Sequence, residues 1–480
     1  MRLPLLRQIA LAVTCAAAPP AAVAQDSKAD LIGGIDAHRQ RAEKVALQIW
    51  DYAEVGYQET RSSALLQQQL KEAGFSVEAG VAGMPTAFVA SYGSGKPVIG
   101  ILAEFDALPG ITQQATPERA PAPDKDAGHA CGHHLFGTAS TFAAIAVRDW
   151  LARGKAPGTI RLYGTPAEEG GAGKVYMVRE GLFKDVDVVL HWHASDRNDA
   201  SHSTSLANKS AKFRFHGVSA HAAGAPERGR SALDGVEAMN HMVNMLREHV
   251  PQDTRIHYVI TQGGSAPNVI PDFAEVFYYV RHPDPLQVQA IFERVAKAAE
   301  GAAMGTGTRV EHEIIHGIYA VLPNEPLARV MDANLRRVGG IKYDAAERAF
   351  AETLRKSLGE NPPAIDSAAG VAPFEFYRSG GSTDVADVSW AVPTAGLRTA
   401  TWVPGTASHS WQAIAAGGTT IGLKGMIVAA KTLALTAVDL LTTPQLIADA
   451  AAAYRKQLPP GWTYRPLLGD RKPPLDYRKK

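Results

Sequence analysis

A thiol and three imidazoles are concentrated in one short segment, G-H-A-C-G-H-H at residues 128–134. Cys131 and His133 stand two positions apart in it. Thiolate and neutral imidazole are donors that suit zinc and its divalent neighbours, and glycines allow a chain to fold around an ion. The segment therefore indicates a metal site. A small buried cysteine beside capping histidines is the alternative that the segment alone leaves open.

Two adjacent carboxylates, Glu168 and Glu169, follow the predicted strand 159–164 in the segment T-P-A-E-E-G-G. Such a pair is costly unless something cationic satisfies it. Beside a metal, one carboxylate can ligate while its neighbour takes a proton from water, whose pKa the ion lowers to roughly 7. Taken alone, the pair fits a solvated acidic turn or a helix N-cap slightly better. The nearby Lys174 does not complete a phosphate loop, because Glu168 stands where the first glycine is required.

Histidines accompany two further predicted strands. The strand 186–192 leads into His191 and His193, which share a face because alternate strand residues do. We expect His193 to be the ligand, since it lies nearer the carboxyl end of the strand. His409 follows the predicted strand 394–402 across a short loop. Each histidine alone fits an ordinary structural or surface residue as well.

A shared place in the fold joins these residues into one predicted site. Parallel sheets place ligands at the carboxyl ends of their strands. The candidates are all expected to follow strands of one sheet: Asp106, Cys131 with His133, the Glu168 pair, His193 and His409. Asp106 is more useful as a carboxylate that fixes a ligand histidine than as a ligand itself, with a structural turn residue as the alternative.

The elements that must position these residues alternate between strands and helices. Short β-rich runs at 86–92 and 97–105 precede a helix at 135–153, and strands follow at 159–164 and 186–192. This alternation predicts an α/β fold with a largely parallel sheet and helices on both faces.

The pattern changes at about residue 208. From there to 316 the predicted order is β-α-β-β-α-β, the signature of a ferredoxin-like α+β unit. We therefore predict a catalytic domain in two segments, 25–207 and 323–480, interrupted by an inserted domain over 208–322. The tail after Leu458, rich in Lys, Arg and Pro, is expected to be peripheral.

Composition excludes some classes of partner. The 480 residues, 46% of them apolar, can bury at least one sizeable core, and 49 Lys and Arg against 48 Asp and Glu leave a net charge of +1. No broad attraction to nucleic acid or an acidic membrane follows. The longest apolar segment, 426–441, carries Lys431 and Asp439 at helical spacing, which is typical of a packed helix and not of a membrane span. We expect a small-molecule partner.

The first 24 residues resemble a secretory signal peptide. Arg2 and Arg7 precede an apolar stretch at 9–18, and A-V-A at 22–24 offers small residues for cleavage. An exported, periplasmic chain beginning near Gln25 is therefore expected. Its only cysteine would be Cys131, so it would form no internal disulfide.

Together these motifs resemble the metallopeptidase family that contains aminoacylase, carboxypeptidase G and the auxin amidohydrolases, in the branch with a G-H-x-C-G-H signature. The resemblance runs from about residue 35 to 440 and is carried, in order, by A-C-G-H, P-A-E-E-G-G, G-V-S-A-H-A and N-V-I-P. The motifs G-G-S-T-D-V from Gly380 and H-S-W-Q from His409 are similar to the p-aminobenzoyl-glutamate hydrolase subunits of that branch.

The resemblance implies two divalent metal ions, zinc or manganese, with Glu168 as the general base. The implied ligands, by position, are Cys131, His133, Glu169, His193 and His409. Cys131 would bridge or nearly bridge the ions. Two departures stand out. Glu104-Phe105-Asp106 replaces the H-x-D of many relatives, which leaves the metal stoichiometry open, and His134 stands where branch members often carry Asp or Asn.

In the inserted domain the resemblance implies a lid or dimerisation role. His221 of G-V-S-A-H matches a histidine that reaches a neighbouring subunit's site and polarises the scissile carbonyl. Asn268 of P-N-V-I-P matches a substrate-contacting position. Two subunits are then implied, as a homodimer or with a second type of subunit.

The activity implied is hydrolysis of the amide bond of an N-acyl or N-aroyl amino acid, such as an aminobenzoyl-glutamate. A dipeptidase or carboxypeptidase using the same site is one alternative. A periplasmic binding protein that has lost catalysis on a hydrolase fold is another, because fold does not guarantee chemistry. Retention of both Glu168 and Glu169 with all five candidate ligands argues against that loss.

Overall fold

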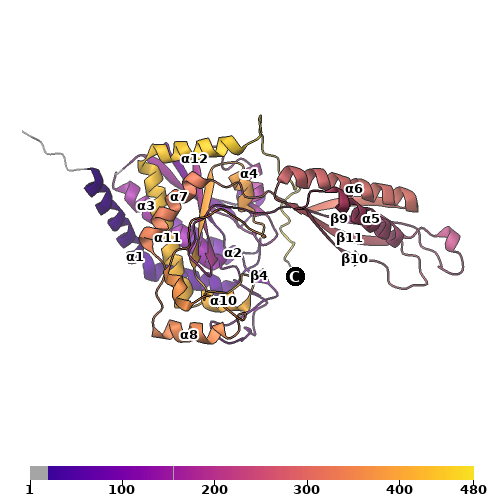
Figure 1. Ribbon diagram of the computed structural model, residues 1–480, viewed down its shortest axis with the longest axis horizontal. Helices are drawn as coiled ribbons and strands as arrows, with labels where there is room; N and C mark the ends of the chain where they lie inside the picture. The colour runs from indigo at the N-terminus through magenta and orange to yellow at the C-terminus, as the bar shows by residue number, and fades with distance from the viewer. Residues whose placement is uncertain (1–19, 155, 480) are drawn as a thin grey trace, which may run out of the picture.

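The computed structural model describes residues 20–154 and 156–479, which form two domains (Figure 1). Most of the expected signal peptide, residues 1–19, lies outside the described residues. Its expected cleavage region at 22–24 falls at the start of helix α1 (Pro20–Tyr52). Cys131 is a free thiol, as expected for a chain with no cysteine partner inside the described part.

The larger domain is built on a six-stranded sheet. Strands β6, β3, β7 and β14 run parallel, and β1 and β2 continue the sheet antiparallel at one edge. β3 is buried along its whole length, as its unbroken apolar run V-I-G-I-L-A requires of a strand covered on both faces. The predicted α/β class with a largely parallel sheet is confirmed. The strand order is β1 (Ser76–Ala79), β2 (Phe88–Ser94), β6 (Gly158–Gly164), β3 (Val98–Ala103), β7 (Val188–Ser195), β14 (Thr394–Ala400).

Long helices cover this sheet. α3 (His133–Ala152) and α11 (Thr420–Thr442) pack on the strands, and α1 lies against both helices. Among the described helices, α11 alone is long and apolar enough to cross a membrane by length and composition, but 89% of that apolar window is buried inside the protein, which is typical of a core helix. The remaining helices of the domain are α2 (Thr60–Glu72), α4 (Gly173–Arg179), α7 (Glu325–Val338), α8 (Ala345–Arg355), α9 (Val385–Ser389), α10 (Trp411–Gly417) and α12 (Pro444–Gln457).

The inserted domain extends away from the catalytic domain and has its own apolar core (Figure 1). Its elements follow in the predicted β-α-β-β-α-β order, and its four strands form an antiparallel sheet in the order β10-β11-β9-β12, with both helices packed on it. The bounds are β9 (Ala207–His216), α5 (Ala232–Leu246), β10 (Arg255–Gln262), β11 (Phe273–His282), α6 (Pro285–Thr306) and β12 (Arg309–Ile318).

The prediction of a peripheral tail is wrong. After α12 the chain runs down past the junction of the two domains, and the C-terminus lies between them (Figure 1). Leu467 and Leu468 are only 4% and 3% exposed. The abundance of Lys, Arg and Pro in this segment concealed the few apolar and aromatic residues that pack.

Candidate metal centre and active site

Five side chains that the sequence singled out converge in space. The donor atoms of Cys131, His133 and His193 lie within 4.8 Å of one another, and so do those of Cys131, Glu169 and His409. Cys131 belongs to both groups, so its thiol lies where one ligand would touch two ions. The structure thus brings together all five predicted ligands, although their roles as ligands stay predictions.

Individual distances show how close this approach is. The Sγ atom of Cys131 lies 3.4 Å from Nε2 of His193, and Nε2 of His409 lies 3.4 Å from Oε1 of Glu169. His191 lines the neighbouring cavity but joins neither donor group. The preference for His193 over His191 agrees with this geometry.

The local chain path differs from the expected one at two ligands. Cys131 and His133 do not follow a strand of the central sheet; they follow the two-residue strand β5 (Ala127–Gly128), which pairs only with β4 (Leu108–Pro109), and they open helix α3. Gly132, with φ of 74°, makes the turn and packs against β7 so closely that a Cβ there would come within 2.4 Å of Ala194.

The other predicted residues do belong to the central sheet. Asp106 follows β3, the Glu168 pair follows β6, and His409 follows β14 by a loop, whereas His193 lies inside β7 instead of after it. His409 has a φ of 59°, a left-handed conformation that a non-glycine residue adopts at a cost and that surrounding contacts must maintain.

Asp106 connects two of the predicted ligands. Its Oδ1 atom lies 3.0 Å from Nδ1 of His133, and its Oδ2 atom accepts a hydrogen bond of 2.9 Å from the backbone N–H of Glu169. Burial would raise the pKa of Asp106, but its hydrogen bond with His133 outweighs burial and lowers it. A single ionised carboxylate therefore orients an imidazole and a metal-binding turn, as the sequence predicted for an orienting residue.

The donor set fits a pair of divalent cations. Nε2 of His133 and Oε1 of Glu169 are buried without a hydrogen-bond partner among the described residues. Burial raises the pKa of the Cys131 thiol, and burial together with the Glu104 carboxylate raises the pKa of Glu168. Cations would satisfy these atoms and favour the ionised forms. A thiolate, three imidazoles and a carboxylate suit zinc or manganese.

The turn that carries Glu168 and Glu169 is strained and held from outside. Ala167 has a left-handed φ of 58°, and its N–H donates to Oε1 of the buried Glu59 at 2.8 Å. The hydroxyl of Tyr57 donates to the carbonyl of Gly171 at 2.7 Å. Sequence reasoning missed both supports, because neither residue lies in a recognisable motif.

A buried ion-pair group lies beside the metal centre and was also missed. Nζ of Lys174 lies 2.7 Å from Oε1 of Glu104 and 2.7 Å from Oδ1 of Asp384. The other oxygen of Glu104 lies 3.0 Å from Nε2 of His133, so the two groups meet there. A lysine next to glycine at the start of a helix was a usable signal, but that pattern points first to phosphate binding.

The other two imidazoles of the G-H-A-C-G-H-H segment do not point to the metal centre. Nε2 of His134 lies 3.0 Å from the carbonyl of Gly417, and Nε2 of His129 lies 3.0 Å from that of Ile49. Burial lowers the pKa of His134 to about 3, so it is a neutral donor that braces α10 against α3. The departure at His134 therefore serves packing.

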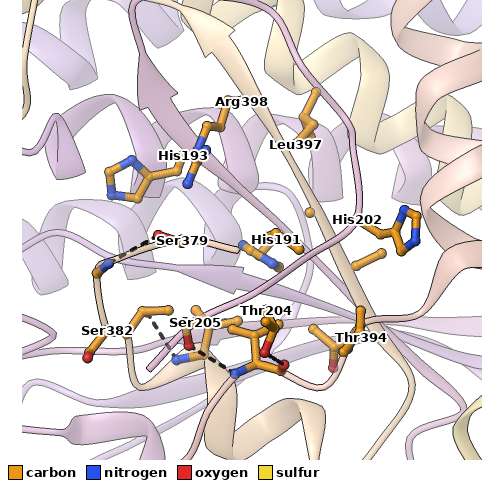
Figure 2. Close-up of a pocket in the computed structure, with 18 of the residues that line it drawn as sticks. His191, His193, His202, Thr204, Ser205, Ser379, Ser382, Thr394, Leu397 and Arg398 are labelled. Atoms are coloured by element: carbon orange, nitrogen blue, oxygen red, sulfur yellow. Dashed lines mark hydrogen bonds between the residues drawn. The ribbon is translucent and has the colours of Figure 1, made fainter. Parts of the chain in front are cut away.

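A cavity of about 510 Å³ opens beside the donor cluster. Glu168 lines it together with Arg398 of β14 and Arg281 of β11, so both domains contribute a cation. In Figure 2, His191 lies between His193 and Arg398 on one side and the hydroxyl side chains of Thr204 and Ser205 on the other. A cavity with convergent polar groups is typical of a small-molecule site. Further hydroxyl groups line it at Ser201, Ser203, Ser379, Ser382 and Thr383.

His221 and Asn268 are not brought into this cavity. Both are exposed on the inserted domain, where the N–H of Ala222 donates to the carbonyl of Asn268 at 3.0 Å. Nδ1 of His221 accepts a 3.0 Å hydrogen bond from the N–H of Gly224. Neither side chain contacts the predicted ligands of its own chain.

Comparison with known proteins agrees with the fold and the site. The family model described as "Peptidase dimerisation domain" matches residues 207–306. The chain belongs to the M20 peptidase family, a family of metal-dependent amidohydrolases. It is 41% identical to a subunit of the p-aminobenzoyl-glutamate hydrolase of Escherichia coli (strain K12), over 88% of this chain and 93% of that protein.

More distant relatives share the same extent. The Xaa-Arg dipeptidase of Homo sapiens is 28% identical over 88% of this chain and 91% of that protein. The crystal structure of a dinuclear metal-binding peptidase of the M20 family from Bacillus subtilis has a TM-score of 0.58 at 19% identity, covering 85% of this chain and 99% of that one. At that identity the likeness shows a shared fold.

Proposed function

We propose that this chain hydrolyses the amide bond of an N-acyl or N-aroyl amino acid with a free carboxylate, such as an aminobenzoyl-glutamate. The observation that carries the proposal is one cavity lined by the donor cluster, by Glu168 and by two arginines, Arg281 and Arg398. The arginines offer an anchor for a carboxylate, since guanidinium groups bind carboxylates in a bidentate geometry. The name of the Escherichia coli relative supports the choice of substrate.

The residues divide the chemistry between them. Two divalent ions, when bound by Cys131, His133, Glu169, His193 and His409, would polarise an amide carbonyl and make water acidic near neutral pH. Glu168 takes the proton from the attacking water and delivers it to the leaving amine nitrogen. Asp106 holds His133 with Nε2 directed toward the donor cluster.

A second copy of the chain completes the site in this proposal. His221 and Asn268 are exposed and lie outside their own chain's cavity, so they are available to a partner's cavity. There, His221 stabilises the carbonyl oxygen as negative charge develops on it. The Escherichia coli relative is named as one of several subunits of its hydrolase, which supports a second type of subunit as the alternative to a homodimer.

We also propose that the chain is exported to the periplasm after cleavage near Ala24, on the strength of its first 24 residues. Expression of the full chain followed by cell fractionation and N-terminal sequencing tests this. Recovery of the intact chain, starting at Met1, from the cytoplasmic fraction would contradict export.

Glu168→Gln tests the role of the base. Turnover should fall by about 100- to 10,000-fold, the usual contribution of general acid-base catalysis, while bound metal stays unchanged. Glu180→Gln is a matched control, because Glu180 is an exposed carboxylate at the end of α4. The measurements are steady-state rates and metal content by elemental analysis. Retained turnover in Glu168→Gln would exclude this residue as the base.

A substrate panel tests the specificity. We expect aroyl-glutamates to be cleaved with a higher kcat/KM than dipeptides, and Arg398→Met to raise KM for carboxylate-bearing substrates more than it lowers kcat. The panel is assayed with zinc and with manganese. Preference for dipeptides would assign the site to a dipeptidase instead, and inactivity on every compound would contradict both assignments.

A further inference from the structure

The end of the chain contacts the backbone of a predicted metal ligand. The hydroxyl of Tyr477 donates to the carbonyl oxygen of Glu169 at 3.1 Å, and Nη2 of Arg478 donates to the same oxygen at 3.0 Å. On the other side of this residue, Asp106 accepts the N–H of Glu169. Both backbone groups of Glu169 are therefore fixed, one by the catalytic core and one by the tail.

This turn needs external support. Ala167 and Ala172, with φ of 58° and 57°, bracket it in left-handed conformations that cost free energy for residues with a Cβ. Gly170 and Gly171 between them add conformational freedom. A turn of this kind keeps one geometry only when its surroundings hold it, and the tail supplies two of the hydrogen bonds.

The tail fits the surface beneath it through its backbone. Nε2 of Gln58 donates to the carbonyl of Leu475 at 2.8 Å, and Nη1 of Arg179 donates to that of Arg471 at 2.7 Å. Side chains of the catalytic domain thus bind carbonyl groups of the tail at two separated positions. The last residues of the tail are held in place before they reach the metal-binding turn.

Tyr477 also occupies space that a glycine leaves. A Cβ at Gly56 would come within 2.2 Å of the Tyr477 hydroxyl oxygen. The rings of Tyr57 and Tyr477 meet edge to face, with centroids 5.7 Å apart. Tyr57 in turn binds the carbonyl of Gly171, so one pair of tyrosines contacts the turn at two carbonyl groups.

We propose that Tyr477 and Arg478 are positioning residues, which set the geometry of the metal-binding turn through the Glu169 carbonyl. The inference rests on the metal role of Glu169 in the proposed function. Partners of metal ligands usually contribute about 10- to 100-fold to metal affinity or activity. The same tail contacts the inserted domain, where Nη1 of Arg471 donates to the carbonyl of Ile315 and the Tyr319 hydroxyl donates to that of Arg465.

The test is metal affinity in the full chain. The double variant Tyr477→Phe with Arg478→Met removes both hydrogen bonds and keeps most of the packing. Lys479→Met is the matched control, since it removes a neighbouring exposed charge of the tail. Zinc affinity is measured by competition with a chromogenic chelator, and thermal unfolding of the metal-free proteins is measured in parallel.

We expect the double variant to bind zinc about 10- to 100-fold more weakly than the Lys479→Met control, with the same unfolding temperature when metal-free. Equal zinc affinity in the two proteins would overturn the inference. If the double variant also unfolds earlier, Tyr477→Phe with Arg478→Lys decides: recovered affinity supports positioning, and continued loss overturns it.

The result separates this inference from the proposed function. A wild-type chain that binds no divalent ion contradicts the proposed metal centre itself. A wild-type chain that binds zinc and hydrolyses the substrate, with variants of equal affinity, contradicts only the role of the tail.

Discussion

Two groups of ionisable side chains meet inside the catalytic domain and are balanced in different ways. In the first, Lys174 forms ion pairs with Glu104 and Asp384, and all three side chains are buried. In the second, Glu168 and Glu169 lie beside the Cys131 thiol. No lysine or arginine in the described part of the chain forms an ion pair with either of these glutamates.

The difference shows which group is complete. A buried carboxylate is costly unless a cation compensates it, and Lys174 provides that compensation within the chain. The donor cluster has unpaired donor atoms instead, and its thiol and general base would keep their protons in the absence of cations. The first group therefore belongs to the structure permanently, whereas the second is completed by ions from outside.

The largest effect should come from breaking the incomplete group at its shared ligand. Cys131→Ser replaces the donor common to both groups, so bound metal should fall below one ion per chain and turnover by about 1,000-fold or more. His134→Asn is the control within the same segment, because His134 binds only the Gly417 carbonyl. Elemental analysis and rates check this. Two tightly bound ions in Cys131→Ser would show that the thiol is not shared.

Breaking the complete group should instead lower stability. Lys174→Met leaves two buried carboxylates without their cation, so the free energy of unfolding should fall by about 3 to 5 kcal/mol. Urea unfolding of the metal-free proteins measures this. Adding Glu104→Gln and Asp384→Asn to Lys174→Met should recover part of the loss. A single variant as stable as the wild type would mean that Lys174 does not compensate these charges.

A smaller effect is expected at a buried carboxyl group that has neutral partners. Asp387 accepts hydrogen bonds from the Tyr464 hydroxyl at 2.7 Å and the Tyr319 N–H at 3.1 Å, and burial raises its pKa to about 8. The folded state therefore binds this proton more tightly than the unfolded state. The resulting stability is fully present below pH about 4 and is lost as pH rises to about 8.

Asp387→Asn removes this titration. The stability of the wild type relative to Asp387→Asn should decrease by about 1 kcal/mol or more between pH 4 and pH 9. Chemical unfolding of both proteins across that range measures it. A constant difference would indicate that the pKa of Asp387 is near its ordinary value in the folded protein.

Much of the fold followed from local sequence patterns. The alternation of strands and helices predicted the parallel sheet, and the order β-α-β-β-α-β predicted the inserted domain, because hydrophobic periodicity is a local property. The donors could be grouped because strands of one sheet end along one edge. The turn at Cys131 reached the same place by a different path, as the start of α3.

The supports of the site were beyond sequence reasoning. Lys174 pairs with Asp384 across 210 positions, and Tyr477 reaches Glu169 across 308. Such polar partners leave no periodic signal, since each is a single residue whose neighbours have other roles. The packing of the tail left no signal for the same reason, because its composition is that of a solvated segment.

The sequence by itself determined the kinds of donor available, their order along the chain and the α/β scaffold, because residue chemistry and hydrophobic periodicity can be read locally. Tertiary structure alone decided that His133 faces the donor cluster while His134 braces a helix. It also decided that Lys174 neutralises Glu104 and that the C-terminal tail reaches the metal-binding turn. These outcomes depend on which distant side chains become neighbours when the core packs, and packing is a property of the whole chain.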